Sequence, residues 1–136
     1  MKLSLELARK HFPKNFILHY FDSDLMKDKD PEVTRYLFCM ESEGKSVCRI
    51  YQSENHEIEL YISDLHVDEK YHKTGIGTEI MKAFENIGKE LQADLYLFCN
   101  KDSYVIEWYE KLGFQFLNNK DENQIWMIKY YEPSNF

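Results

Sequence analysis

The sequence predicts an α+β fold in which helices pack on a mixed β-sheet. Strand-like segments joined by short turns come first, a long helical segment follows, and an unbroken apolar segment comes next. A second helix and two further strands complete an order that is typical of helices packed on a mixed sheet. The 136 residues are 43% hydrophobic and contain no repeat or Gly/Ser linker, so they fit one domain, residues 1–136.

The first half of the chain is predicted to consist mainly of strands. Val33–Glu41 and Ser46–Gln52 form a predicted hairpin, because the four residues between them include Gly44. The other predicted elements are a short helix over Ser4–His11, a strand over Phe16–Phe21, a loop over Asp22–Pro31 and a turn over Ser53–His56.

The next predicted strand, Glu57–Val67, has an irregular apolar pattern. Its first apolar residues alternate at period two up to Ile62, but the next apolar pair is Leu65 and Val67. The phase therefore slips by one residue across Ser63-Asp64, which is what a β-bulge produces. The alternative is a strand that ends near Ile62.

The second half contains the predicted helices. Apolar residues at steps of four, four, three and four indicate one face of a helix over Gly75–Leu91. The apolar segment Asp94–Cys99 is typical of a strand buried on both faces. Ser103–Leu112 is predicted to be a second helix, with Trp108 in its core stripe, ended by Gly113. A closing hairpin is expected from Phe114–Leu117 and Gln124–Tyr131, around the turn 118–121.

The composition excludes several classes of function. The formal charge of −7 disfavours general nucleic-acid binding and favours a cationic acceptor such as an amine, unless it serves solubility alone. No apolar run is long enough to span a bilayer, and residues 1–14 do not resemble a signal peptide, so we expect a cytoplasmic protein. The three Cys are widely spaced in apolar segments, which is typical of reduced thiols and not of a disulfide framework. The five His have no common metal-ligand spacing, so no metal is expected.

The segment between the bulged strand and the long helix suits an anion. A helix N-terminus presents unpaired N–H groups, and glycines let the backbone approach a phosphate closely. Here the segment that joins the strand to the helix contains Gly75 and Gly77, with Lys70, His72 and Lys73 just before them. A P-loop is excluded because Thr78-Glu79 follow the last Gly, and a dinucleotide fingerprint because Ile80 replaces its third small residue.

Residues 57–131 resemble the GNAT acetyltransferase family. The family's cofactor motif follows a strand ending in an apolar-x-Val triplet, which matches Leu65-His66-Val67 and then His72 to Gly77. Its later signature Tyr-Glu-Lys-Leu-Gly-Phe stands here as residues 109–114. The resemblance implies a mixed, mostly antiparallel sheet with helices on its faces and acetyl-CoA as co-substrate. The eleven residues 22–32 stand where the family places two helices, so the N-terminal helical region is abridged.

The resemblance also implies which residues bind acetyl-CoA. In the family, backbone amides at the positions of Leu65 and Val67 contact the thioester carbonyl and the pantetheine arm, and the following loop holds the pyrophosphate. His72 replaces the family's Gln or Arg, and Asp102 replaces its Asn, with Asn100 nearby. The implied cofactor-binding residues are Leu65, His66, Val67, His72, Lys73, Thr74, Gly75, Ile76, Gly77, Thr78, Asn100, Asp102 and Tyr109.

Tyr109 and Asp64 are the candidate catalytic residues. Tyr109 stands where many relatives use a hydroxyl to protonate the leaving thiolate, and the alternative is a buried helix aromatic. Asp64 or His66, two residues apart beyond the slip, could take a proton from the amine, and Glu59 is a third choice.

The function predicted from these features is acetyl transfer from acetyl-CoA to an amine of a small molecule or protein. The alternative is a non-catalytic acyl-CoA-binding or interaction module. An unrelated α+β scaffold with a chance Gly-x-Gly is a third reading. A homodimer is left open.

Overall fold

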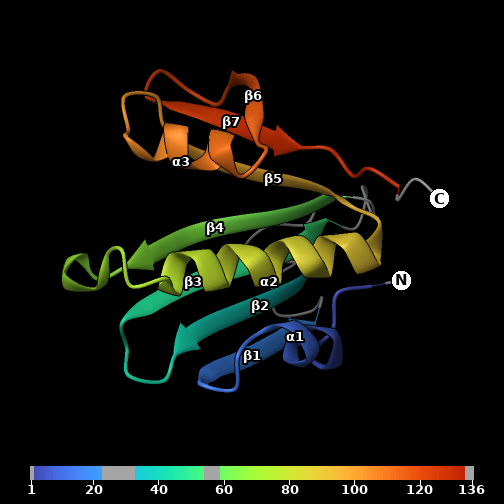
Figure 1. Cartoon of the computed structure of the whole chain (residues 1–136). Coiled ribbons are helices and arrows are strands. Elements are labelled where there is room, and N and C mark those ends of the chain that lie inside the picture. Colours follow the sequence, from blue (N-terminus) through green and yellow to red (C-terminus); the bar gives the residue numbers. More distant parts are fainter. Residues whose placement is uncertain (1, 23–32, 54–58, 134–136) are drawn as a thin grey trace.

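The computed structural model describes residues 2–22, 33–53 and 59–133 and has one seven-stranded sheet (Figure 1). The strand order is β1-β2-β3-β4-β5-β7-β6, and neighbours are antiparallel except for the parallel pair β4 and β5. The strands are β1 (Phe16–Asp22), β2 (Val33–Glu41), β3 (Ser46–Ser53), β4 (Glu59–Val67), β5 (Asp94–Asn100), β6 (Gln115–Asn119) and β7 (Gln124–Lys129). The helices are α1 (Leu5–His11), α2 (Ile76–Leu91) and α3 (Val105–Lys111). The predicted α+β class and the mixed sheet are confirmed.

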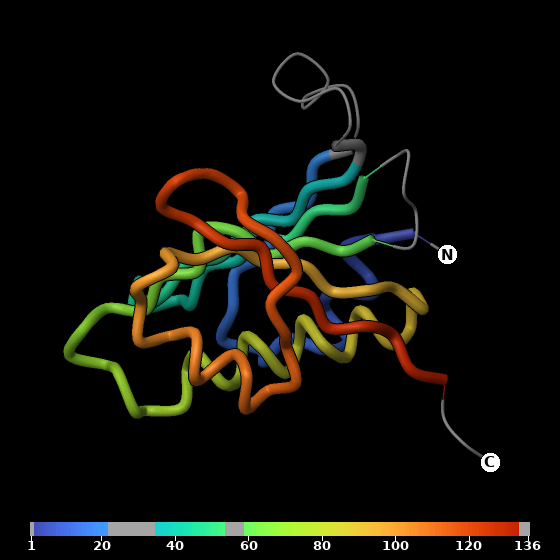
Figure 2. Tube along the Cα trace, turned by 90° about the horizontal axis from the view of Figure 1, so that it is seen from above, coloured from blue at the N-terminus to red at the C-terminus, as the bar shows by residue number. Residues whose placement is uncertain are grey.

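The three helices lie on the same face of the sheet, seen below the strands in Figure 2. Ser4 caps α1 by accepting a hydrogen bond from the Leu7 N–H, and α1 packs against α2. The fully buried side chains between helices and sheet include Leu37, Ile50, Leu60, Ile80, Phe84, Ile87, Leu97 and Met127. Within the described ranges, none of the helices has the length and apolar character needed to cross a membrane.

Phe84 lies at the centre of this core, because it is fully buried on the sheet-facing side of α2. We expect Phe84→Ala to lower the free energy of unfolding by about 3–5 kcal/mol, since the cavity left by the ring cannot fully collapse. Urea denaturation of both proteins measures the difference. Phe116→Ala is the matched control: that ring is 58% exposed on β6, and its removal should change stability by less than about 1 kcal/mol.

The predicted bulge in β4 is present, and the strand continues past Ile62 to Val67. Arg49 pairs with Ser63, but Val47 pairs with His66, so two steps along β3 match three along β4. The bulged segment of β4 includes Asp64, whose backbone φ of 53° is uncommon for a residue other than Gly. The bulge reverses the facing of the residues that follow, as the phase slip predicted.

The hairpin between β2 and β3 and the C-terminal half also follow the prediction, with one correction. Gly44 and Gly113 both have positive φ, as a tight turn and a helix end require. β5 is not buried on both faces: Leu95 and Leu97 are buried, but Tyr96 and Phe98 on the other side are only partly covered. The helices cover one face of the sheet, so the second face of β5 is shielded only by neighbouring rings.

Part of the predicted N-terminal structure lies outside the described residues. The predicted loop begins at Asp22, which belongs to β1, and its remaining residues are among 23–32. Most of the predicted turn before β4 falls in 54–58. The predicted boundaries of the other elements differ from the observed ones by a few residues at most, as expected where helix and strand ends fray.

Candidate functional site

A pocket of about 690 Å³ lies where the end of β4, the start of α2 and helix α3 meet. Its walls combine backbone from a strand, the N-terminus of a helix and aromatic side chains. The lining residues are Leu65, His66, Val67, Glu69, Tyr71, His72, Lys73, Gly75, Gly77, Thr78, Tyr104, Val105, Trp108 and Tyr109. Of the thirteen residues predicted to bind the cofactor, nine line this pocket.

The first wall is the part of β4 beyond the bulge. β4 pairs with β5 only from Glu59 to Tyr61, opposite residues 94–96, and the two strands then diverge (Figure 1). β7 pairs with the other edge of β5, along residues 95–100. Residues Leu65 to Val67 therefore face an opening in the sheet, where the backbone groups directed toward β5 have no partner on that strand. Such groups are available to a bound ligand.

The floor of the pocket is the N-terminus of α2. Gly75 is the N-cap residue with a φ of 92°, and no side chain caps the first turn of the helix. The unpaired N–H groups and the helix dipole therefore favour an anion here. The preceding loop is held in shape by His72, whose Nε2 lies 2.9 Å from the Val67 carbonyl oxygen, and by Lys73 in a left-handed conformation. Lys73 and His72 both line the pocket.

Tyr109 closes the pocket on the α3 side. It is 8% exposed, and its ring contacts Trp108 and Phe114, with centroids 5.2 and 6.1 Å away. Burial, with smaller contributions from Cys99 and Tyr104, raises the pKa of Tyr109 to about 12. No hydrogen bond from its hydroxyl to another described residue is present, so the O–H can donate to a ligand. A neutral phenol that stays protonated at neutral pH is suited to act as an acid.

Sequence reasoning missed several lining residues, of which Trp108 is the clearest. Trp108 was predicted to be core, but it is only partly buried and lines the pocket. Its ring lies against Gly77, where an added Cβ would come within 3.4 Å of Trp108 Cη2. The helical stripe of α3 signalled that this face was apolar, but a stripe cannot distinguish a core from a pocket wall. Tyr71 and Tyr104 had no local signal.

Asp64 does not line the pocket. Its carboxylate forms an ion pair with Arg49 on β3, with Oδ2 3.0 Å from Nη1, and both side chains are about half exposed. His66 lines the pocket, whereas Asp64 lies on the surface beside it. The two candidate bases are thus in different surroundings, which their spacing in the sequence did not reveal.

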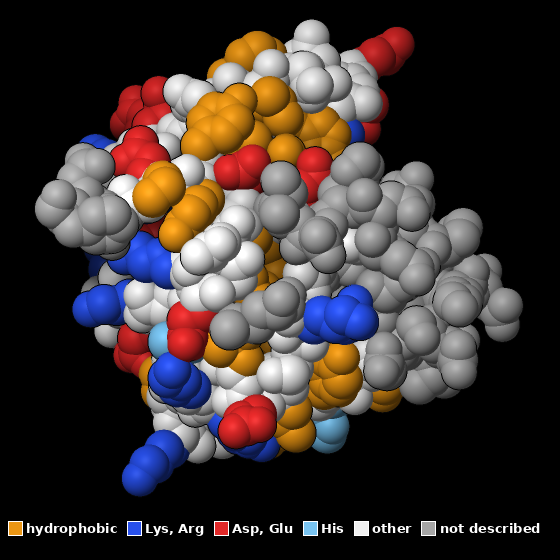
Figure 3. All heavy atoms as spheres, turned by 90° about the vertical axis from the view of Figure 1, so that its right-hand side faces the viewer, with side chains coloured by type: hydrophobic (Ala, Val, Ile, Leu, Met, Phe, Trp, Pro, Cys, Tyr) orange, Lys and Arg blue, Asp and Glu red, His pale blue; other side chains and the backbone are white. Residues whose placement is uncertain are grey.

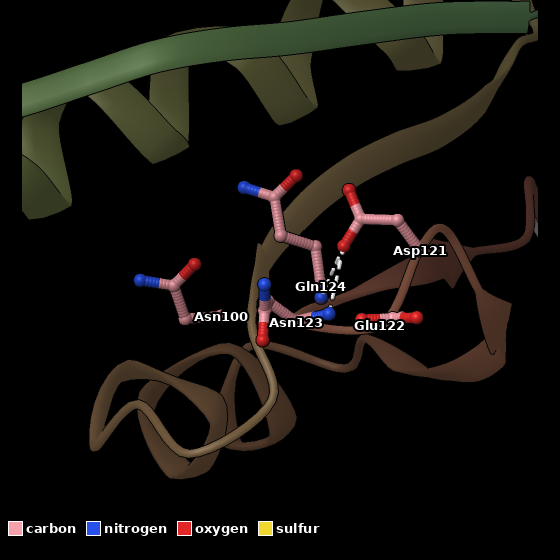
Figure 4. Close-up of a pocket in the computed structure, with 5 residues that line it drawn as sticks. All are labelled: Asn100, Asp121, Glu122, Asn123 and Gln124. Atoms are coloured by element: carbon pink, nitrogen blue, oxygen red, sulfur yellow. Dashed lines mark hydrogen bonds between the residues drawn. The ribbon is translucent and has the colours of Figure 1, made fainter.

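Four predicted cofactor-binding residues are not among the lining residues: Thr74, Ile76, Asn100 and Asp102. The Thr74 hydroxyl donates to the Tyr71 carbonyl, and Ile76 packs on the core. Asn100 lies in a separate polar hollow of about 510 Å³ with residues 121–123 of the β6–β7 turn and with Gln124, the first residue of β7 (Figure 4). In that turn, Asp121 Oδ1 accepts hydrogen bonds from the backbone N–H groups of Asn123 and Gln124. This hollow is a surface depression next to an Asx turn, separate from the larger pocket.

The arrangement of the larger pocket suits a phosphate-containing thioester with a long linear arm. An uncapped helix start and two basic side chains can hold phosphate, and the diverging edge of β4 can hydrogen-bond an amide-rich arm. The protonated hydroxyl of Tyr109 could donate a proton to a leaving group. Across the described ranges there is no cluster of three or more His, Cys, Asp or Glu that could hold a metal ion.

Comparison with known proteins gives one family and many similar structures. Residues 5–131 match the family model described as an acetyltransferase (GNAT) domain. Similar structures include an acetyltransferase from Thermus thermophilus (TM-score 0.61, 13% identity, covering 77% of this chain and 68% of that one). A GNAT family acetyltransferase from Elizabethkingia anophelis with acetyl-CoA bound has a TM-score of 0.60 at 15% identity, and the match covers 87% of this chain and 99% of the other one. The PaiA N-acetyltransferase from Thermoplasma acidophilum in complex with coenzyme A has a TM-score of 0.57 at 18% sequence identity. That match covers 79% of this chain and 66% of the other one. No curated protein matches the sequence.

Proposed function

Because this chain belongs to the GNAT acetyltransferase family, we propose that it transfers an acetyl group from acetyl-CoA to an amine. The observation that supports this most directly is one pocket that joins the diverging part of β4, the uncapped start of α2 and the hydroxyl of Tyr109. Acetyl-CoA is the co-substrate, in keeping with similar structures that contain acetyl-CoA or coenzyme A.

Each part of the pocket has a role in this proposal. Acetyl-CoA supplies the activated acetyl thioester. The amides of Leu65 and Val67 stabilise the developing oxyanion and hold the pantetheine arm, in line with the family resemblance. The loop from His72 to Thr78 binds the pyrophosphate, and Tyr109 donates a proton to the departing thiolate. The amine loses its proton to a base beside the bulge.

The test is incubation with acetyl-CoA and a panel of amines, with release of free thiol measured by a colorimetric reagent. Acceptor-dependent thiol release, together with acetylated product by mass spectrometry, supports the proposal. The second candidate, a module that binds acyl-CoA without catalysis, is favoured by the short connection between β1 and β2. It predicts saturable acetyl-CoA binding with no thiol release above the blank for any amine.

Asp64 is our proposed base, and its replacement is the next prediction. Asp64→Asn keeps the size of the side chain and tolerates the left-handed backbone, but it removes the charge and the proton acceptor. We expect kcat to fall by about 10²-fold and the KM of the amine to rise, with the affinity for acetyl-CoA unchanged. Steady-state kinetics with varied amine measure both constants.

The control for Asp64 is its ion-pair partner. Arg49→Gln breaks the same 3.0 Å contact but leaves the carboxylate in place, so kcat should stay within a few-fold of the wild type. Equal losses in both variants would mean that the ion pair matters only for the shape of the bulge. A loss confined to His66→Gln would assign the base to the imidazole that lines the pocket.

A further inference from the structure

Aromatic side chains form a row across five strands on the face of the sheet opposite the helices. Directly paired positions place Phe21, Tyr36, Tyr51, Tyr61 and Tyr96 side by side from β1 to β5. Leu60 and Ile62 are buried under the helices, so Tyr61 between them points to the other face. The Tyr61 ring stacks on Tyr51 and Tyr96, with centroids 5.0 and 4.9 Å apart.

Glu59 places a carboxylate against this row. Its oxygens accept hydrogen bonds from the Tyr61 hydroxyl at 2.6 Å and from the Tyr96 hydroxyl at 3.2 Å. Burial and the contact with Glu59 raise the pKa of Tyr61 above its usual range, and burial with the Glu59 charge raises that of Tyr96 to about 12. Both hydroxyls therefore remain donors at neutral pH.

Glu59 has capacity left for a ligand. A carboxylate offers about four acceptor sites, of which the two hydroxyls occupy two. Among the described residues no Lys, Arg or His forms an ion pair with Glu59. A half-buried carboxylate surrounded by aromatic rings is suited to an ammonium group, which gains from the charge and from the ring faces together.

Neighbouring contacts agree with this reading. The Lys120 ammonium lies 4.6 Å from the centroid of Phe98, next to Trp126, whose ring packs edge-on against Tyr61. This group of rings therefore already has a cation on one side. Figure 3 views the end of the molecule where β4 begins, and hydrophobic and acidic side chains lie next to each other in its upper half.

The position of Glu59 relative to the pocket decides which amine it can hold. Tyr61 and Tyr96 form the last pair before β4 and β5 diverge. Leu65, beside the reacting carbonyl in the proposed function, lies four residues after Tyr61 along β4, or roughly 13 Å at about 3.3 Å per residue. Glu59, which contacts the Tyr61 hydroxyl, lies two residues further from Leu65 in the chain. An ammonium group bound at Glu59 is therefore too far away to be the amine that is acetylated.

We propose that Glu59, Tyr61 and Tyr96 form a cation subsite for a second ammonium group of the acceptor, which makes the acceptor a long aliphatic polyamine. This inference rests on the proposed acetyltransferase function, because the pocket must supply the reacting acetyl group. The acceptor lies along the opening between β4 and β5, with one amine at the pocket and a distal one at Glu59. The net charge of −7 adds long-range attraction for such a polycation.

The direct test is calorimetric titration with spermine in the absence of acetyl-CoA, using the wild type and two variants. Glu59→Gln should weaken spermine binding about tenfold or more. Glu132→Gln removes the same charge from an exposed carboxylate after β7 and should leave the affinity within about twofold. Circular dichroism establishes that each variant is folded. Equal effects of the two changes, or none from Glu59→Gln, would overturn the subsite.

Kinetics separate the subsite from the proposed function. Glu59→Gln should raise the KM for spermine about tenfold and leave that for hexylamine, which has one amine, unchanged. If no amine is acetylated but spermine binding still depends on Glu59, the proposed function fails, and Glu59 remains a polyamine-binding site without an acceptor role. If hexylamine is acetylated as well as spermine, with no effect of Glu59→Gln, the function stands and the subsite fails. Should that variant not fold, the wild type still decides, since the subsite requires spermine to have a KM at least about tenfold below that of hexylamine.

Discussion

Gly75→Glu should abolish measurable acetyl-CoA binding, a loss of at least about 10³-fold in affinity. Gly75 lines the pocket at the uncapped start of α2, with a φ of 92° that L side chains rarely adopt. The Cβ itself would meet open space, so the loss comes from two other causes. A carboxylate at this position neutralises the positive end of the helix where phosphate is expected, and the strained backbone disturbs the loop. Calorimetry with acetyl-CoA measures the affinity.

Gly44→Glu is a closely matched control for this change. Gly44 also has positive φ, at 75°, and an added Cβ there would again meet open space, but it lies in the turn between β2 and β3. The Gly44→Glu variant therefore has a similarly strained backbone and the same added charge, but the substituted residue does not line the pocket. We expect it to lower stability by about 1–2 kcal/mol and leave acetyl-CoA affinity unchanged. Equal loss of binding in both variants would mean that backbone strain, and not the anion site, explains the effect.

Tyr109→Phe should lower kcat by about 10²–10⁴-fold and change the affinity for acetyl-CoA little. The substitution keeps the ring that packs against Trp108 and Phe114 and deletes only the hydroxyl. Single-turnover thiol release, with calorimetry for affinity, distinguishes the two effects. Parallel losses in rate and affinity would instead assign Tyr109 a packing or binding role.

Tyr104→Phe provides the control for Tyr109, because it removes another hydroxyl that borders the same pocket from a side chain that is 77% exposed. Its kcat should remain within a few-fold of the wild type.

The raised pKa of Tyr109 adds a pH prediction. Burial favours the neutral phenol, so the acid is present below its pKa of about 12 and lost only above it. The rate should therefore show no alkaline decline assignable to Tyr109 below about pH 11.

Much of the fold could be predicted because its signals are local. The period of apolar residues identified α2, Gly44 identified the turn between β2 and β3, and Gly113 identified the end of α3. The phase slip before Leu65 predicted the bulge, since side-chain facing in a strand depends only on counting residues. The loop before α2 could be predicted to line an anion-binding pocket because the glycines and the helix start are adjacent in the sequence.

The parts that could not be predicted depend on contacts between distant segments. Asp64 is paired with Arg49 on the next strand, and Asn100 lies at the β6–β7 turn, away from the pocket. Neither placement follows from local spacing, because register and strand neighbours are decided by packing of the whole sheet. The sequence likewise predicted two buried faces for β5, whereas only one is covered by helices.

The sequence by itself therefore determined the elements, the bulge and the loop, all of which are encoded in short-range periodicity and turn residues. Only the tertiary structure decided that β5 pairs with β4 for three residues and then leaves it, which opens the pocket. It also brought tyrosines from four strands, and with them Glu59, into one row. The physical reason is that strand pairing joins residues far apart in the chain, and the register that aligns them minimises the free energy of the whole sheet.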